Sequence, residues 1–171
     1  MIEPESFTVT KASAARSQLE TSISLWFNNA DPISIHALAA AANELLNAIG
    51  ARAGKPSEIQ PYIKSRPPAI RDRLRKAQNF FKHAGRDLNE RFEYHPMHGE
   101  VLITDSILIY HALAGEMTPL MAAFTARLSV TEPDLASFLS GIMSQETAKN
   151  LAMVGRPQFL KAFLGGSIKP H

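Results

Sequence analysis

Apolar residues recur along most of the chain at the three- and four-residue spacing of amphipathic α-helices. No segment alternates apolar and polar residues for long, and tight Asn-Gly or Asp-Gly hairpin turns are absent. The pattern predicts helices over residues 10–28, 32–51, 67–85, 99–115, 118–129, 132–144 and 146–165, with a shorter one near 57–64. We therefore predict an all-α protein, a compact helical bundle of six to eight helices.

Helix start signals support these boundaries. Asp31-Pro32 and Thr118-Pro119 each place a capping side chain before a proline, which is tolerated in the first turn of a helix. Thr131-Glu132-Pro133-Asp134 also offers a capping side chain shortly before a proline, and its acidic residues would interact favourably with the positive end of the helix dipole. The last predicted helix is expected to break near Gly155-Arg156-Pro157.

Apolar stripes on the predicted helices indicate which faces are buried. The stripe of the second predicted helix consists of Ile35, Leu38, Ala42, Leu45 and Ile49, and that of the third of Ile70, Leu74, Ala77, Phe81 and Ala84. We expect the helices at 32–51, 67–85 and 99–115 to form the core. The helix at 10–28 should pack across them through Leu19, Ile23, Trp26 and Phe27.

Length and composition fit one folded domain. The 171 residues are 45% hydrophobic and 20% charged, so we expect a single helical domain over 1–171 with loose ends at 1–9 and 165–171. The absence of cysteine excludes disulfides, thiolate nucleophiles and Cys-ligated metals. We see neither a signal peptide nor an apolar run that would span a membrane, and predict a cytoplasmic protein without membrane partners.

Positive charge is concentrated in one part of the chain. The net charge is +2, but residues 64–91 carry +6 and the remainder −4. Such a concentration indicates an anionic partner, although a solvated helix face explains it equally well. On the helix at 67–85 and its extension, we predict that Arg71, Arg75, Lys82 and Arg86 bind RNA or another polyanion.

The same helix carries a candidate catalytic group. Asn79, His83 and Asp87 follow each other at four-residue intervals and share one side of a helix. An imidazole between an amide and a carboxylate can act as a general base or a metal ligand. The alternative is a histidine that is simply solvated, because this side faces away from the apolar stripe.

The segment Asn79-x-x-x-His83 resembles the signature of HEPN domains, small and often dimeric helical bundles that include many ribonucleases. That signature places an Arg, commonly followed by Asn, four to six residues before a His. Here Gln78 stands at the Arg position, and Arg75 lies one turn upstream of Asn79, outside the expected spacing. The resemblance implies an RNA-associated protein in which His83 activates or protonates at the scissile phosphate and Asn79 orients it. The missing Arg predicts compromised or absent cleavage, because charge in the transition state is unsupported.

Two further functions stay open. His36, Glu44, His83 and Asp87 offer a set of imidazoles and carboxylates for a metal or small molecule between facing helices, although no Glu-x-x-His motif supports it. A protein-interaction adaptor with no chemistry is the third reading. No motif predicts a cofactor, since phosphate-cradling glycine patterns are absent.

Remaining aromatic residues suggest how the bundle is completed. Phe80 and Phe81 point in different directions on the helical wheel, so Phe80 should need a second partner surface, which we expect to be another subunit of a homodimer or another helix.

His111 lies in an apolar helix and is predicted to be a hydrogen-bonded core histidine. His95 and His98 are predicted to be incidental residues of a loop or a helix start.

Overall fold

The computed structural model describes residues 6–82, 89–132, 135, 151 and 153–166, with the side chain of Arg75 left out. All regular structure in these residues is helical, as predicted. The helices are α1 (Lys11–Phe27), α2 (Pro32–Arg52), α3 (Gln60–Ser65), α4 (Pro68–Lys82), α5 (Met97–Ala114), α6 (Pro119–Thr131) and α9 (Arg156–Leu164). The helix predicted at 132–144 and the first part of the one predicted at 146–165 fall largely outside the described residues.

Local capping explains where three helices begin. Thr10 and Ser13 form a reciprocal capping box at the start of α1, where the Ser13 amide donates to the Thr10 hydroxyl over 3.1 Å. The Ser34 amide donates to the Asp31 carboxylate over 2.7 Å before α2. The Thr118 hydroxyl accepts from the amide of Met121 before α6. These caps satisfy amides that have no partner inside the helix.

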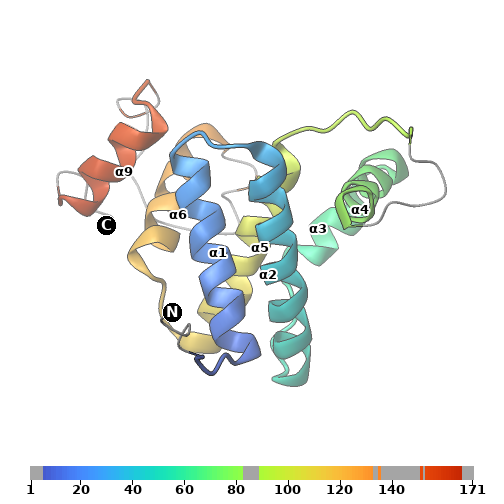
Figure 1. The fold of residues 1–171 in the computed structure, drawn as a ribbon, viewed down its shortest axis with the longest axis horizontal. Coiled ribbons are helices and arrows are strands. Elements are labelled where there is room, and N and C mark those ends of the chain that lie inside the picture. Colours follow the sequence, from blue (N-terminus) through green and yellow to red (C-terminus); the bar gives the residue numbers. More distant parts are fainter. Residues whose placement is uncertain (1–5, 83–88, 133–134, 136–150, 152, 167–171) are drawn as a thin grey trace, which may run out of the picture.

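Four helices form the hydrophobic core. In Figure 1, α1 and α2 run side by side with α5 and α6 behind them, α9 lies at one end, and α3 and α4 lie at the opposite end. The predicted contribution of α1 is confirmed, because Leu19, Ile23, Trp26 and Phe27 are all buried. We call α1, α2, α5 and α6 the four-helix core, and residues 60–82 the α3–α4 arm.

The predicted place of α4 in the core is wrong. Ile70 is 44% exposed, Leu74 and Phe81 are half-buried, and Ala77 is the stripe residue that is fully buried among those described. The apolar stripe does face the protein, but α4 is so rich in Arg and Lys that it covers one edge of the bundle instead of filling its centre.

The buried face of α2 is rotated from the predicted one. Ile35 and Ala42 are buried as expected, but Leu38, Leu45 and Ile49 are half-buried. Ala39 and Leu46 take their place in the core. Small side chains allow neighbouring helices to approach closely, so the alanine-rich side faces inward and the larger residues flank it.

Gly50 brings the end of α2 into close contact with the following loop. A Cβ atom at this position would lie 2.5 Å from the carbonyl oxygen of Lys55 and 2.9 Å from the side chain of Ile109. The Lys55 ammonium donates to the carbonyl of Ala112, and the Ser57 hydroxyl donates to the carboxylate of Asp105. Both bonds fasten the loop at 53–59 to α5, just before α3 begins.

Two carboxylates lie inside the four-helix core and both have partners. Asp105 accepts from the Asn43 amide over 2.7 Å and from the Asn47 amide over 3.3 Å, in addition to Ser57. Glu100 accepts from the Trp26 indole over 2.8 Å. Buried polar groups must find such partners, since leaving them unpaired costs the energy of desolvation.

The start of α9 is joined to the core through Glu100. The Arg156 guanidinium donates to this carboxylate over 3.0 Å and lies 3.9 Å above the ring of Trp26. Gly155 is the N-cap of α9, which agrees with the predicted break at Gly155-Arg156-Pro157.

Candidate anion-binding site

Two prolines separate the helices of the α3–α4 arm. Arg66 is extended, with φ of −73° and ψ of 153°, as expected for a residue that precedes proline. Pro67 and Pro68 follow, and α4 begins at Pro68. Because α4 touches the rest of the protein along one narrow side, two hollows remain between α3, α4 and α5.

The first hollow has a volume of about 450 Å³. We call it the amide hollow, and it is lined by Asn43, Gln60, Ile63, Lys64, Arg71, Leu74, Gln78, Val101 and Leu102. The cations Lys64 and Arg71 form no ion pair with a described residue, and no acid belongs to the described lining. The Nε of Arg71 is buried without a hydrogen-bond partner among the described residues. The hollow thus combines two positive charges with amides that can donate and accept hydrogen bonds.

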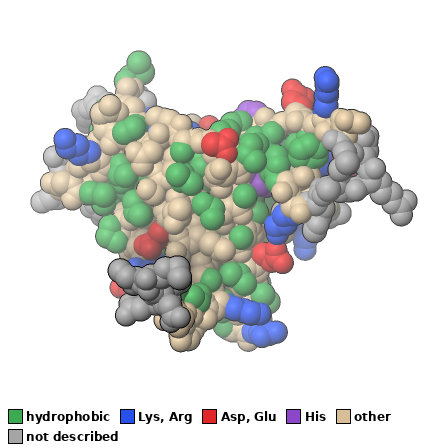
Figure 2. Space-filling view, viewed as in Figure 1, with side chains coloured by type: hydrophobic (Ala, Val, Ile, Leu, Met, Phe, Trp, Pro, Cys, Tyr) green, Lys and Arg blue, Asp and Glu red, His purple; other side chains and the backbone are tan. Residues whose placement is uncertain are grey.

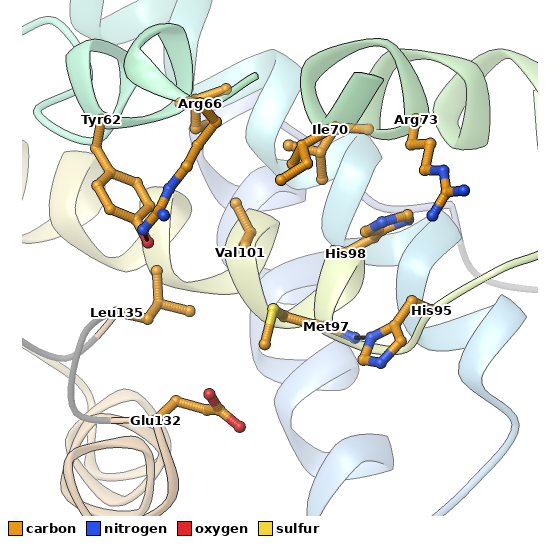
Figure 3. Close-up of a pocket in the computed structure, with 12 residues that line it drawn as sticks. Tyr62, Arg66, Ile70, Arg73, His95, Met97, His98, Val101, Glu132 and Leu135 are labelled. Carbon is orange, nitrogen blue, oxygen red and sulfur yellow. Dashed lines mark hydrogen bonds between the residues drawn. The ribbon is translucent and has the colours of Figure 1, made fainter. Parts of the chain in front are cut away.

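The second hollow has a volume of about 430 Å³ and shares Ile63, Leu74 and Val101 with the first. We call it the histidine hollow. Its remaining lining residues are Tyr62, Arg66, Ile70, Arg73, His95, Met97, His98, Glu132 and Leu135. Arg66 lies 4.1 Å above the ring of Tyr62 and donates to its hydroxyl. Figure 3 shows this pair on one side of the hollow and Arg73, His95 and His98 on the other.

Burial favours the neutral form of His98. It lowers the pKa of this imidazole, and electrostatic interactions with the neighbouring His95 and Arg73 lower it further. A neutral imidazole can donate one hydrogen bond and accept another. His95 lies just before α5 and His98 in its first turn, as predicted for a helix start, and both line the hollow together with Arg73 of α4.

The predicted catalytic pair is only partly described. Asn79 is exposed on α4, whereas Gln78, its neighbour, lines the amide hollow. His83 and Asp87 lie outside the described residues. A site formed by Asn79 and His83 therefore stays a prediction.

Of the four predicted RNA-binding cations, the side chains of Arg71 and Lys82 are described, and their surroundings differ. Arg71 lines the amide hollow, but the Lys82 ammonium is 2.7 Å from the carboxylate of Glu44 on α2. The side chain of Arg75 and all of Arg86 lie outside the description. Lys64, Arg66 and Arg73 belong to the basic segment at 64–91, but no sequence signal marks them as lining residues, because their places at the two hollows depend on the fold of the arm.

The predicted metal set is only partly described, because His83 and Asp87 lie outside the described residues and only His36 and Glu44 can be placed. No group of three His, Asp or Glu side chains in the described part of the chain lies close enough together to hold a metal ion. His36 is 1% exposed, and neither ring nitrogen has a hydrogen-bond partner among the described residues. Its ring is packed edge-on against Phe81 at 5.2 Å and Tyr94 at 5.4 Å between centroids. Burial lowers the pKa of His36 to about 4, with added repulsion from His98 and Lys82.

Phe80 finds its partner surface within the same chain. Its ring lies 5.7 Å from Phe81 and 5.6 Å from Phe92, which belongs to the segment before α5. Figure 2 shows hydrophobic side chains gathered beside histidines at the end of the molecule where α4 lies. A second subunit is therefore not needed to explain Phe80.

Comparisons with family models, with curated proteins and with solved structures found no significant match. The HEPN resemblance accordingly stays a prediction that depends on this chain's own residues. Among the described helices, none is both long and apolar enough to cross a membrane.

Proposed function

We propose that this chain binds RNA, or a polyanion of similar charge density, through the α3–α4 arm, with compromised or absent cleavage. The observation that carries the proposal is the amide hollow, where Lys64 and Arg71 converge and no described lining residue is acidic. Unpaired cations attract phosphates and release counterions when a nucleic acid binds.

The other cations of the arm extend this charge. Arg73 forms no ion pair with a described residue and lies on α4 near Arg71 in sequence. Lys76 and Lys82, by contrast, are paired with Glu90 and Glu44 at 2.6 and 2.7 Å. The cations of the two hollows, Lys64, Arg71 and Arg73, are thus not neutralised by a described acid, unlike Lys76 and Lys82.

The side-chain amides of the amide hollow favour RNA over other polyanions as the ligand. Gln60 and Gln78 line the same hollow as Lys64 and Arg71, whereas the amide of Asn43, also in the lining, already donates to Asp105. Asn and Gln side chains can pair with base edges, and RNA is read mostly at unpaired bases that such groups can reach. We propose a single-stranded segment as the ligand, and we expect little or no hydrolysis because Gln78 carries no charge to support the transition state.

The test is a titration of labelled single-stranded RNA by fluorescence anisotropy over a range of salt concentrations. Wild-type affinity should fall steeply with salt, with a slope of about −0.7 per phosphate contact. A triple Lys64→Gln, Arg71→Gln, Arg73→Gln variant should bind at least about ten times more weakly at low salt, with a slope smaller by about 2.

The matched control is a double Lys76→Gln, Lys82→Gln variant, which removes two cations that are already paired. It should lose much less affinity than the triple variant. Undetectable binding at low salt, or equal losses in the two variants, would contradict the proposal. The predicted homodimer belongs to the same proposal, and sedimentation of the free protein and its RNA complex tests it separately.

A further inference from the structure

The histidine hollow differs from the amide hollow in the chemistry of its walls. Half of its lining residues are aliphatic side chains or Met: Ile63, Ile70, Leu74, Met97, Val101 and Leu135. In Figure 3, Ile70, Val101 and Met97 lie between the Tyr62–Arg66 pair and the group of Arg73, His95 and His98. An apolar centre is therefore flanked on two sides by cations.

These walls select a ligand with both an apolar and an anionic part. Apolar walls favour a hydrocarbon body, because binding removes apolar surface of both partners from water. Arginine guanidinium groups favour a carboxylate, which they can bind with two parallel hydrogen bonds. A phosphate backbone satisfies the second requirement but not the first.

We propose that the histidine hollow binds a small amphipathic anion, namely a carboxylate with an aliphatic chain. Its volume of about 430 Å³ is within the usual range of small-molecule sites. The inference goes beyond the RNA proposal and does not depend on it.

The placement of charges orients this ligand. Glu132 belongs to the lining but lies well away from Arg73 in Figure 3, near Leu135. An acid repels the carboxylate, so the head group lies toward Arg73 and His98 and the aliphatic chain extends toward Leu135. His98 lines the hollow with Arg73, and its Nδ1 is buried without a hydrogen-bond partner among the described residues, so the imidazole has hydrogen-bonding capacity left for the head group.

The experiment is calorimetric titration of the full chain with decanoate, with decanol as the uncharged analogue and decylammonium as the cationic one. Decanoate should bind with one-to-one stoichiometry, more tightly than decanol, and decylammonium should not bind detectably. Arg73→Gln should weaken decanoate binding by about tenfold, as expected for the loss of a charge-assisted hydrogen bond, and leave decanol binding unchanged.

Two filling variants locate the ligand. Ile70→Trp on α4 and Met97→Trp on α5 replace side chains that are 44% and 39% exposed, so each protein should still fold, which circular dichroism checks. Each variant should abolish decanoate and decanol binding together. Lys76→Gln is the control on the same helix, since Lys76 is paired with Glu90 and is not in the lining, and it should bind decanoate like the wild type.

The proposal is overturned by no detectable decanoate binding at millimolar concentration, by equal affinity for decanoate and decanol, or by normal binding in both filling variants. Titration of the Ile70→Trp protein with RNA separates the two proposals. Lys64, Arg71 and Arg73 remain in this variant, so its RNA affinity should be unchanged whether or not decanoate binds to the wild type.

Discussion

The four-helix core and its boundary with the α3–α4 arm differ in how their buried polar groups are paired. In the core, Glu100 and Asp105 are buried, and each accepts hydrogen bonds from two or more neighbours. At the boundary, His36 of α2 is covered by the rings of Phe81 and Tyr94 with neither nitrogen bonded to a described residue, and Arg71 of α4 keeps a buried Nε without such a partner. The two core carboxylates are thus paired, whereas the boundary with the arm retains unused hydrogen-bonding capacity.

This difference supports the proposal that the core is a scaffold and the arm a binding surface. Elements with few buried apolar contacts open at a lower free energy than the core of the same protein, and binding surfaces are commonly found on them. The arm contributes Ala77 as a fully buried residue of α4, while α1 alone contributes Leu19, Ile23, Trp26 and Phe27. We therefore expect the arm and its contact with α2 to respond to ligand, salt and pH while the rest of the core stays unchanged.

The largest expected effect comes from removing a core aromatic ring. Phe27→Ala should lower the free energy of unfolding by about 3–5 kcal/mol, because the ring is fully buried against Trp26 and Phe159. Leu74→Ala in the arm should cost about 1–2 kcal/mol, since Leu74 is half-buried and borders both hollows. Urea denaturation measures both, and equal costs would remove the distinction between scaffold and arm.

The next effect concerns the paired carboxylate of the core. Asp105→Ala should cost about 2–4 kcal/mol, because the Asn43 amide loses its acceptor in a buried place. Ser57→Ala removes one donor and leaves the other bonds to Asp105 intact, so it should cost about 1 kcal/mol. Thermal unfolding measures the stability of both variants. An Asp105→Ala variant as stable as the wild type would show that the hydrogen bonds to Asp105 contribute little to stability.

The pH dependence of stability should come largely from His36, where α2 contacts the arm. The pKa of His36 is lowered from 6.5 to about 4 in the folded protein. Between these two pH values, His36 is therefore protonated in the unfolded chain but neutral in the folded one. The free energy of unfolding should therefore fall by on the order of 2–3 kcal/mol as the pH drops from about 6.5 to about 4, and this contribution should level off below.

A His36→Leu variant isolates that effect. Leucine suits the surrounding rings of Phe81 and Tyr94 and does not titrate, so the variant should lose less stability between pH 7 and pH 4.5 than the wild type. His98 contributes in the same direction, because its pKa is lowered too. Identical pH profiles for wild type and His36→Leu, measured by urea denaturation, would show that His36 is not the responsible group.

The smallest effect is expected for the exposed ion pairs of the arm. Glu90→Gln breaks the pair with Lys76 and should change the free energy of unfolding by less than about 1 kcal/mol. The same substitution frees the Lys76 charge and should strengthen RNA binding at low salt. A loss of RNA affinity in this variant would mean that the arm's charge does not control binding.

Helix boundaries were predictable because their signals are local. Thr118-Pro119 marks the start of α6, and Asp31-Pro32 that of α2, within a few residues of sequence. The basic character of residues 64–91 was also visible directly. Each of these features depends on neighbouring residues alone.

Packing and the hollows were harder to predict, since they depend on residues far apart in the chain. His111 is predicted in the core but is exposed, whereas His36, a predicted member of a metal or small-molecule site, is buried. In α5, apolar residues occur on every side, so periodicity does not indicate which side faces outward. The hollows combine α3, α4 and the start of α5, and nothing in the spacing of Arg66, Arg73 and His98 indicates that they converge.

The loop after α2 packs so closely against Gly50 that a larger residue at this position would displace the loop. A single added methyl group would collide with the carbonyl of Lys55, in the loop that Ser57 fastens to Asp105. Displacing that loop would shift the start of α3, and with it Tyr62 and Arg66 at the wall of the histidine hollow. We expect laboratory selection for altered ligand preference to find substitutions around Gly50, remote from any ligand, as readily as in the hollow itself.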